Sequence, residues 1–544
     1  MSKLRLFFLA CCVTLGLCGA ASAAEANPPS VASTVPSMVG SNMCERLATP
    51  NLADAHGTPV DFAAIPDAPS HIISAKVVPA NGDVPAYCYA TGYVAPAVGF
   101  ELRLPTTWNG KFAMVGCGGM CGGIQAPGCD TALVKGYACI MSDMGHKGTQ
   151  IDAEWAFNNL QAAVDFGYRA THVAAVAGKY ITAVFYGQKP KLSYFFGCST
   201  GGRQGYVEAQ RFPDDFNGIL AGSPPMSETG DGLDILWAIK ATENADGTPL
   251  LKAKDILLVN HAVVKQCDMN DGVKDGVIGD PRLCKFDPAS LVCKAGQTGD
   301  CLTLAQADAV KKIYAGPHNA AGQRWYYGVM PGSETNWIGS LQRDDGQRST
   351  YKAFMTSMFR FLNFAPSAGP GWTMAQFDWE RDPPRLDSME ALFTAGNPDM
   401  HRFKAAGGKL ISFQGWNDHI VQAEAVTDYY DKAERTMGGR AETQDFYRLF
   451  MVPGLNHCQG GTGAYAVDWT GALEDWVERG KAPDQILSVR PQDPTGGLYP
   501  RFFTPAPGVM ANAIFSRPLY PYPARAVYSG KGDPTQASSY KAVQ

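Results

Sequence analysis

The sequence predicts an α/β protein with a mostly parallel sheet, and an inserted lid that divides the sheet-forming sequence into two parts. From Cys44 to about Pro225, short apolar runs such as KFAMV and KLSYFFG alternate with helical patterns and glycine-rich turns. This alternation is typical of parallel sheets covered by helices. The same pattern returns at Gly408 with KLISFQG and FYRLFMVP. Between the two parts, long loops and helices rich in aromatic residues predict the lid.

These changes of pattern divide the chain of 544 residues into five segments. They are a signal peptide at 1–23, a flexible lead-in at 24–43, the first part of the core at 44–225, the lid at 226–404, and the second part of the core with a C-terminal tail at 405–544. The formal net charge of -5 shows no basic excess. We therefore expect neither nucleic acid nor an anionic membrane surface as a partner, and the sequence does not predict an oligomeric state.

The N-terminus has the organisation of a secretory signal. Lys3 and Arg5 precede an apolar stretch, and Ala21-Ser22-Ala23 offers a cleavage site after Ala23. The apolar run is short for the alternative, a membrane anchor. We expect a secreted or periplasmic protein.

Export changes the interpretation of the cysteines. Twelve of the 15 lie beyond the signal segment, and an even number in an oxidising compartment predicts disulfides. Four clustered cysteines have three possible pairings, which stay open, and a zinc site is their alternative use. These four are Cys117, Cys121, Cys129 and Cys139. The close pairs expected are Cys44 with Cys88, Cys267 with Cys284, and Cys293 with Cys301.

One serine has the setting of a hydrolase nucleophile. An apolar strand at 192–196 leads into the turn GCSTG, and a helical pattern follows at 202–211. A G-x-S-x-G serine between a strand and a helix lies on the exposed elbow of an α/β-hydrolase. The motif alone also occurs by chance, so the strand and the helix carry the prediction. Ser199 is the candidate nucleophile of an α/β-hydrolase core with an inserted lid.

A serine nucleophile needs a base and an acid, which follow it in this fold on loops after later strands. Asp418 follows KLISFQG, and His457 follows YRLFMVP. The rival His146 precedes the serine, and the rival His419 adjoins Asp418, where chain neighbours seldom face one another. The alternative for His457 is a loop histidine bonded to backbone.

Cys198 and Cys458 adjoin the candidate serine and histidine. A disulfide between them would hold the two loops together, because it requires Cα atoms within about 7 Å. It would close a loop of 260 residues, worth on the order of 5 kcal/mol in the chain-entropy model. The sulfur would then be structural and not a second nucleophile. As the alternative, each cysteine pairs elsewhere or stays reduced.

With these residues in place, the chain resembles the tannase and feruloyl esterase family of α/β-hydrolases, which carries a CS-D-HC arrangement. The likeness extends from Cys44 to about Asp533 and includes WNGKF, FFGCSTGGRQGYVEAQRFPDDFNGILAGSP, VPGLNHCQGG and RPLYPYPARAVYSGKGD. Bacterial mono(2-hydroxyethyl) terephthalate hydrolases belong to the same family. The resemblance implies Ser199 as nucleophile, His457 as general base and then acid, and Asp418 as its orienting partner.

The resemblance also implies an oxyanion hole. Its donors would be the backbone N–H groups of Thr200 and of Gly119, in the loop GCGGMCGG after KFAMV. Glycine suits a loop that substrate approaches closely. The alternative for Gly119 is that the glycines of this loop serve only to form a turn.

A structural calcium ion in the lid is a further implication of the resemblance. The loop CDMNDGVKDGV offers hard oxygen ligands, which suit Ca²⁺, although it lacks the EF-hand pattern. The bland alternative is a solvated turn. The implied ligands are carboxylates of Asp268, Asp271 and Asp275 and carbonyls of Val273 and Val277.

The resemblance implies small aromatic esters as substrates. We expect feruloyl or hydroxycinnamoyl esters first, with gallate esters or terephthalate monoesters as the alternatives. Trp337 is the candidate to stack on the acyl group, against the alternative of a core position. The register of QRSTYKAFMTSMFRF is unclear, so this stretch yields no assigned contact. The rival outside the enzymes is an exported binding protein without turnover.

Overall fold

A computed structural model describes residues 41–54, 57–124, 126–297, 299–345, 347, 349–494, 503–506 and 508–544. The expected signal peptide and most of the lead-in lie outside the described residues, so both stay predictions. The described residues belong to one compact unit. None of the described helices is both long enough and apolar enough to cross a lipid bilayer.

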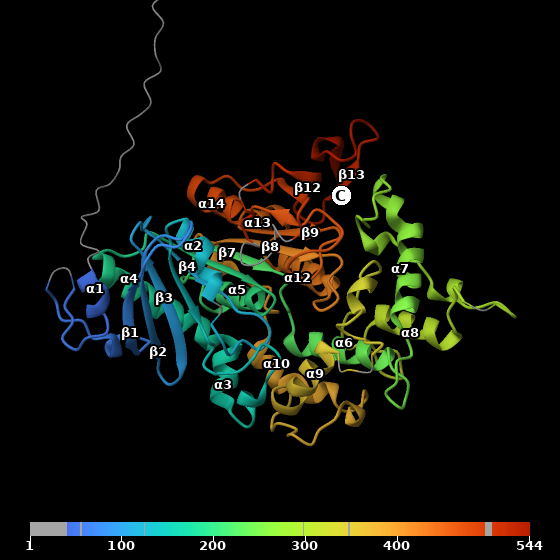
Figure 1. Ribbon diagram of the computed structural model, residues 1–544, viewed down its shortest axis with the longest axis horizontal. Helices are drawn as coiled ribbons and strands as arrows, with labels where there is room; N and C mark the ends of the chain where they lie inside the picture. The colour runs from blue at the N-terminus through green and yellow to red at the C-terminus, as the bar shows by residue number, and fades with distance from the viewer. Residues whose placement is uncertain are drawn as a thin grey trace, which may run out of the picture. The chain divides into compact units, whose positions relative to one another are not determined.

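A nine-stranded sheet forms the centre of this unit, in the order β1-β2-β3-β5-β4-β6-β7-β8-β9 (Figure 1). The strands β1, β2 and β3 are antiparallel to their neighbours. The other six strands, β4 to β9, run parallel to one another. The bounds are β1 Ser70–Val78, β2 Tyr87–Val94, β3 Val98–Pro105, β4 Lys111–Val115, β5 Ala138–Ser142, β6 Leu192–Cys198, β7 Gly218–Gly222, β8 Lys409–Gly415 and β9 Tyr447–Val452. The predicted α/β class with a mostly parallel sheet is confirmed.

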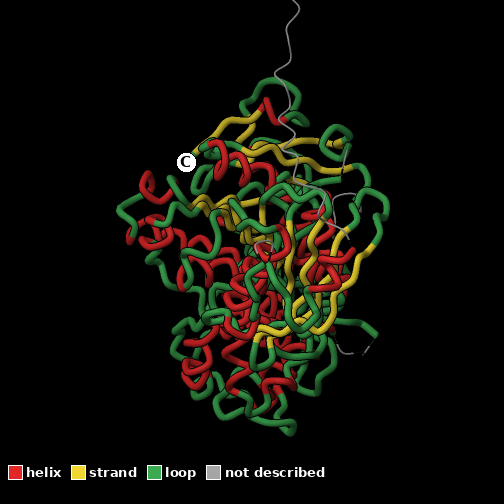
Figure 2. Tube along the Cα trace, turned by 90° about the vertical axis from the view of Figure 1, so that its left-hand side faces the viewer, coloured by secondary structure: helices red, strands yellow, loops and turns green. Residues whose placement is uncertain are grey.

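The parallel strands are apolar throughout because helices cover both of their faces. In β6, Phe195 enters the core layer shared with α4, α5 and α12, whereas Tyr194 and Phe196 enter the opposite layer with α14. Figure 2 shows the strands between helices. The helices around the sheet are α1 Ser41–Arg46, α2 Asp130–Val134, α3 Leu160–Val164, α4 Ala170–Tyr186, α5 Thr200–Arg211, α12 Ala423–Thr436, α13 Arg440–Gln444 and α14 Trp469–Arg479.

The long connection from β7 to β8 contains helices and loops, and its described residues form no strand of a sheet. It occupies the right and lower part of Figure 1. This is where the sequence places the lid, although the exact boundaries stay a prediction. Its α-helices are α6 Glu228–Ala241, α7 Ala253–Cys267, α8 Leu304–Ala315, α9 Thr350–Phe361, α10 Asp387–Phe393 and α11 His401–Ala405.

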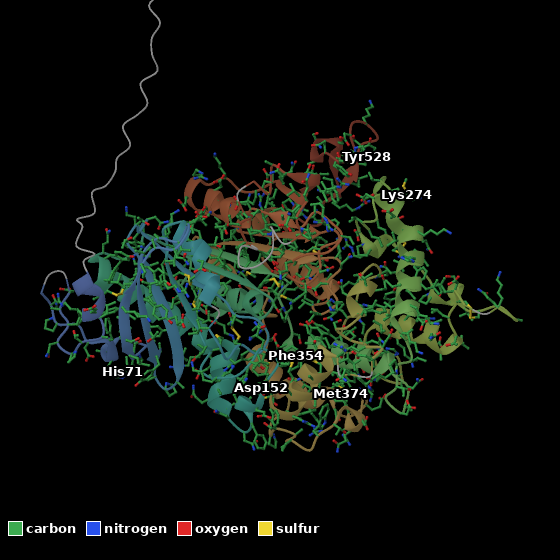
Figure 3. The ribbon with its side chains drawn as sticks, in the orientation of Figure 1. His71, Asp152, Lys274, Phe354, Met374 and Tyr528 are labelled. Atoms are coloured by element: carbon green, nitrogen blue, oxygen red, sulfur yellow. A yellow bond between two sulfur atoms is a disulfide. The ribbon has the colours of Figure 1, made fainter. Side chains whose placement is uncertain are left out.

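The C-terminal part adds two small antiparallel sheets. One has the order β10-β11-β12, and the other is the pair β13 and β14. Their bounds are β10 Ala466–Val467, β11 Ile486–Pro491, β12 Ala513–Leu519, β13 Arg525–Tyr528 and β14 Tyr540–Val543. Figure 3 places Tyr528 beside Lys274, so the C-terminal pair lies against the acidic loop of the lid.

Six disulfides join all twelve cysteines beyond the signal segment. All four expected pairs are among them: Cys44–Cys88, Cys198–Cys458, Cys267–Cys284 and Cys293–Cys301. The open cluster resolves into two pairs with short separations, Cys117–Cys121 and Cys129–Cys139. The alternative use of these four sulfurs as zinc ligands is therefore wrong.

Candidate active site

Ser199 lies on a strained turn between β6 and α5. Its backbone has φ 61° and ψ −129°, a region that non-glycine residues rarely adopt. Its N–H donates to the carbonyl of Gly222 at 2.9 Å. A Cβ at Gly197 would lie 2.3 Å from the Gly201 carbonyl oxygen, so the motif glycines permit the close packing of this turn. This is the geometry of a nucleophile elbow.

The loops after β8 and β9 bring Asp418 and His457 together. His457 Nδ1 lies 2.8 Å from Asp418 Oδ2. The other carboxylate oxygen of Asp418 accepts the N–H groups of Ile420 and Val421, at 3.0 and 3.1 Å. Gln414 Nε2 donates to Oδ2 at 3.2 Å. The acid is therefore held by the chain on both of its oxygens.

Asp418 is ionised although its side chain is fully buried. Burial alone would raise its pKa, but the charge and hydrogen bond of His457 and the N–H of Val421 hold that pKa below the ordinary range. A carboxylate that keeps its charge fixes the tautomer of the imidazole and stabilises the imidazolium that forms during catalysis.

The Cys198–Cys458 disulfide joins the serine turn to the histidine loop, with Cα atoms 6.0 Å apart. The N–H of Cys458 also points to Ser223 Oγ, at 3.4 Å. Ser199 and His457 line the same cavity, although no hydrogen bond joins their side chains within the described part of the chain. Such bonds are often long without substrate and tighten in the complex.

The cavity has a volume of about 390 Å³. Its floor comes from the ends of β4 and β6, and its outer wall from lid helix α9, where Figure 3 labels Phe354. Apart from His457, its described lining side chains are apolar or uncharged. The lining residues are Val115, Gly116, Cys117, Gly118, Gly119, Gly128, Met141, Gln150, Ile151, Cys198, Ser199, Thr350, Tyr351, Phe354, Ile420, His457, Cys458 and Gln459.

The glycine-rich loop after β4 faces Ser199 across the cavity. Gly119 has φ 54°, and a Cβ there would lie 2.2 Å from the carbonyl oxygen of Gln150. Thr200 Oγ1 donates to the carbonyl of Gly119 at 2.8 Å, which ties this loop to the first residue of α5. The Cys117–Cys121 disulfide closes the loop on itself. Gly119 and Thr200 are thus neighbours, as an oxyanion hole requires.

The expectation for Trp337 is wrong. Its side chain is fully buried inside the lid, where Nε1 points to Ser333 Oγ and the ring packs edge-on against Tyr314. It is absent from the residues that line the cavity. The apolar indole packs in the lid core, which is the commoner position for a tryptophan within an apolar stretch.

Neither rival histidine is placed to act as the catalytic base. His146 stacks on Trp155 at 3.6 Å, and its ring nitrogens face the carbonyls of Met144 and Met120. His419 is buried, and its ring nitrogens have no hydrogen-bond partner among the described residues. Burial lowers its pKa to about 4, so it is neutral near neutral pH.

The sequence did not identify several residues that shape the site. Thr350, Tyr351 and Phe354 lie in the stretch whose register was unclear. Asn336 of the lid donates to the carbonyl of Asn417 at 3.0 Å and to Asn456 Oδ1 at 2.9 Å, so it contacts the acid loop and the base loop together. The helical periodicity of α9 was the available signal for Thr350, Tyr351 and Phe354, because the buried Met355 and Met358 mark the register of the helix.

The acidic loop of the lid lies far from the cavity, as the separate positions of Lys274 and Phe354 in Figure 3 show. Asp268 Oδ1 accepts the N–H of Gly276 at 2.9 Å, and Asp271 Oδ1 accepts that of Val273 at 3.1 Å. Burial raises the pKa of Asp268, and it raises that of Asp271 to about 6. The Cys267–Cys284 disulfide braces the start of the loop.

The oxygen donors of this loop suit Ca²⁺ in chemistry, and two buried carboxylates gain from a nearby cation. Asp275 is already paired, because its Oδ2 lies 2.5 Å from Nη2 of Arg517. The three carboxylates do not all lie within 4.8 Å of one another. Binding an ion would therefore require these side chains to turn inward.

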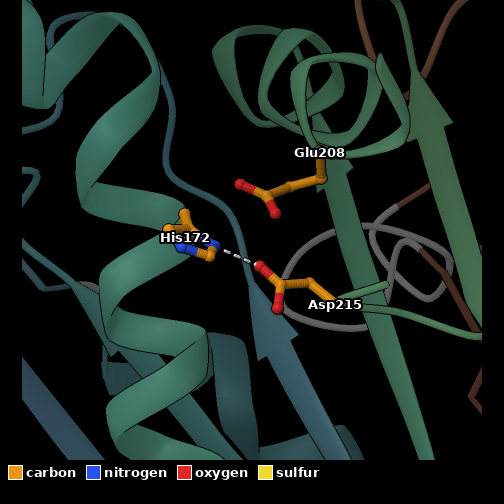
Figure 4. A group of neighbouring side chains, drawn as sticks. All are labelled: His172, Glu208 and Asp215. Atoms are coloured by element: carbon orange, nitrogen blue, oxygen red, sulfur yellow. Dashed lines mark hydrogen bonds and ion pairs between the residues drawn. The ribbon is translucent and has the colours of Figure 1, made fainter. Parts of the chain in front are cut away.

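A second histidine–aspartate pair lies away from the cavity, between α4 and the loop after α5. Figure 4 shows His172, Glu208 and Asp215, whose possible ligand atoms lie within 4.8 Å of one another; no other such group of three occurs in the described ranges. His172 Nδ1 lies 2.5 Å from Asp215 Oδ2, and Lys179 Nζ lies 2.9 Å from Oδ1. The lysine already supplies the cation that Asp215 needs.

Glu208 completes this cluster from α5. Its carboxyl is 1% exposed and accepts no hydrogen bond from the described residues. Burial, and then the charge of Asp215, raise its pKa well above the ordinary value, whereas His172 and Lys179 hold the pKa of Asp215 down against burial. The raised pKa favours the protonated form of Glu208, and the three side chains lie together where α4, α5 and the loop after α5 meet.

Comparison with known proteins places the chain in a family. The family model described as "Tannase and feruloyl esterase" matches residues 83–543. A mono(2-hydroxyethyl) terephthalate hydrolase of Piscinibacter sakaiensis is 32% identical over 570 residues, covering 90% of each chain. A probable feruloyl esterase B-1 of Aspergillus flavus is 30% identical, covering 81% of this chain and 83% of its own.

Solved structures of related proteins agree with this family assignment. The feruloyl esterase B of Aspergillus oryzae superposes with a TM-score of 0.77 at 28% identity, covering 87% of this chain and 97% of that one. The tannin acyl hydrolase of Aspergillus niger shares the fold, with a TM-score of 0.71 at 19% identity, covering 92% and 95%. Taken with the serine elbow and its disulfide, these matches show that the chain belongs to the tannase and feruloyl esterase family.

Proposed function

We propose that this carboxylic ester hydrolase cleaves small esters of aromatic acids, of the feruloyl or hydroxycinnamoyl type, through an acyl-enzyme. One observation carries the proposal. A serine on a strained elbow and an imidazole held by a buried, ionised aspartate line the same cavity, and a disulfide fixes their loops together. This arrangement supports nucleophilic catalysis by a serine.

In the proposed mechanism, His457 takes the proton of Ser199 as the hydroxyl attacks the ester carbonyl. The N–H groups of Thr200 and Gly119 stabilise the oxyanion, on the order of 3 kcal/mol for each donor. His457 then gives its proton to the leaving alcohol, and the acyl group stays on Ser199. Water, activated by His457, releases the acid. Asp418 remains ionised throughout and orients the imidazole.

The lining of the cavity supports an aromatic acyl group. Tyr351 and Phe354 offer rings, and Met141, Ile151 and Ile420 add apolar surface. Relatives named feruloyl esterase B and mono(2-hydroxyethyl) terephthalate hydrolase place aromatic esters first among the candidates. Gallate esters and terephthalate monoesters are the alternative substrates.

The test compares kcat/KM for methyl ferulate, chlorogenate, methyl gallate and a terephthalate monoester. We expect turnover with methyl ferulate and a loss of at least about 10³-fold in Ser199→Ala. A serine-directed phosphonate should label the native chain at Ser199. Failure to label, or unchanged turnover in the variant, contradicts the mechanism and favours an exported binding protein.

We also propose that the acidic loop binds one structural Ca²⁺, remote from the chemistry. The ligands would be Asp268, Asp271, Asp275 and the carbonyls of Val273 and Val277, with Asp275 leaving Arg517 on binding. Ca²⁺ needs ionised carboxylates, and the pKa of Asp271 is raised to about 6. Protons should therefore compete as pH falls through this value.

The measurement is the midpoint of thermal unfolding with Ca²⁺ or with a chelator. We expect Ca²⁺ to raise the midpoint at pH 8 and to have little effect at pH 5, and Asp271→Asn to lose the response at both. No calcium in elemental analysis together with no shift at pH 8 contradicts the site.

Export is the remaining part of the proposal. Six disulfides favour an oxidising compartment, secreted or periplasmic. N-terminal sequencing of the protein recovered outside the cytoplasm should begin at Ala24. Recovery of the uncleaved chain in the cytoplasmic fraction alone contradicts export.

A further inference from the structure

Helix α9 presents one face to the cavity and another to the core of the lid. Thr350, Tyr351 and Phe354 line the cavity, and Phe354 follows the other two by four and three residues, which places it next to both on the helix surface. Met355, Met358 and Phe359 are buried on the lid side. The cavity face is therefore held by a packed core and not by a loop.

Phe359 and Tyr351 have ring contacts that fix this arrangement. Phe359 stacks on Trp372 at 5.4 Å and 13°. Tyr351 meets the buried ring of His419 edge-on at 6.0 Å and 85°. A cavity wall held in this way is preorganised, so its side chains need little ordering when substrate binds.

The hydroxyl of Tyr351 is available to a ligand. Although most of its ring is covered, this hydroxyl has no hydrogen-bond partner within the described ranges, and the residue lines the cavity. Burial and then the negative charge of Asp418 raise its pKa above the ordinary value, so the phenol stays protonated and able to donate. A phenol left without a partner in a desolvated site weakens binding.

We propose that Tyr351 is a specificity-determining residue whose hydroxyl hydrogen-bonds a polar substituent on the ring of the acyl group, while Phe354 packs against the ring itself. This inference rests on the proposed esterase function and assigns the residue that distinguishes hydroxylated or methoxylated aromatic acids from unsubstituted ones. A site built around a hydroxyl partner rejects the analogue that lacks this group, because its own polar atom is then left unpaired.

The test compares Tyr351→Phe with the native protein on two esters, methyl 4-hydroxycinnamate and methyl cinnamate, which differ by the ring hydroxyl. We expect kcat/KM for the hydroxylated ester to fall about 10-fold, and that for methyl cinnamate to change less than about 2-fold. Phe354→Ala should lower both values to a similar extent, since the ring contact serves both substrates.

The matched control is Tyr180→Phe, which removes an exposed phenol on α4, remote from the cavity lining. It should leave both values unchanged. Equal losses on the two esters, or no loss on either, in a folded Tyr351→Phe protein overturn the role of the hydroxyl. Failure of the proposed function looks different, because the native protein would then turn over neither ester.

Discussion

Two of the histidine–aspartate pairs in the described ranges involve a buried aspartate, and they have similar geometry and different use. His457 Nδ1 lies 2.8 Å from Asp418, and His172 Nδ1 lies 2.5 Å from Asp215. The first imidazole lines a cavity together with a serine, whereas the second stacks on Phe212 at 3.9 Å. A short contact between imidazole and carboxylate is therefore not evidence of catalysis. The open cavity and the nearby hydroxyl distinguish the candidate site.

The electrostatics of the two pairs also differ. Both aspartates have lowered pKa values despite burial, but the main partner of Asp418 is His457, whereas Asp215 has both His172 and Lys179 beside it. In the second cluster a further carboxyl, Glu208, accepts no hydrogen bond from the described residues, and its raised pKa favours the protonated form. One pair leaves the imidazole free to exchange protons with substrate, and the other uses it as a structural partner.

The largest expected difference follows from removing each imidazole. His457→Ala should lower kcat for methyl ferulate by about 10⁴-fold or more, because the base and its successor acid are lost together. His172→Ala should keep kcat within a few fold and lower the midpoint of thermal unfolding. Steady-state kinetics with circular dichroism measure both. Equal losses of kcat in two folded variants would remove the distinction.

The two aspartates provide the next comparison. Asp418→Asn should reduce kcat by about 10⁴-fold with little change in fold, because the amide favours the wrong tautomer of the imidazole. Asp215→Asn leaves Lys179 without its anion, which costs about 3 kcal/mol of stability, and should spare the chemistry. The readouts are kcat and denaturant unfolding. A stability loss in Asp418→Asn that matches the one in Asp215→Asn would argue for a structural role of both.

The disulfide beside the site predicts a smaller effect. The paired change Cys198→Ser with Cys458→Ser should lower stability by up to about 5 kcal/mol and reduce kcat about 10-fold, since the serine and histidine loops lose their covalent link. The matched control replaces Cys293 and Cys301, whose link closes a loop of 8 residues in the lid. Mass spectrometry that finds free Cys198 and Cys458 thiols in fully active protein contradicts this role.

The smallest expected effect concerns Glu208. Its folded pKa is raised, so its contribution to stability is fully present below the ordinary glutamate pKa and is lost as pH rises toward the folded value. Glu208→Gln should flatten this dependence and match or exceed the native stability at pH 8, by about 1 kcal/mol. Unfolding free energies at pH 4.5 and pH 8 test it. A variant that is less stable at both pH values would indicate that the carboxylate is ionised and bound.

Much of the site followed from the order of elements along the chain. Ser199 was predicted because a strand, a turn and a helix have distinct local patterns, and His457 because it follows the last parallel strand. The pairing within the cluster of four cysteines depends on how the loop after β4 folds back, which no local pattern encodes. The sequence therefore left it open.

The lid was less predictable. Its aromatic residues serve both the lid core and the cavity, and in α9 the two faces adjoin. Trp337 and Phe354 look alike as apolar residues in helical runs, but packing buries the first and leaves the second at the wall. Asp418 accepts hydrogen bonds from the Gln414 side chain and the Val421 N–H. These bonds depend on a tight loop after β8, which the sequence pattern does not reveal.

The connectivity of the Cys198–Cys458 link has a consequence for biogenesis. The whole lid lies between its two ends, so a nascent chain has to release about four-fifths of its length before the partner sulfur emerges. Until oxidation follows, the hydroxyl and the imidazole are not fastened to each other. Full hydrolytic competence is therefore acquired last. A truncated translation product that lacks His457 should be inert toward the esters of the cell that makes it, and a reduced one should be less active than the oxidised enzyme.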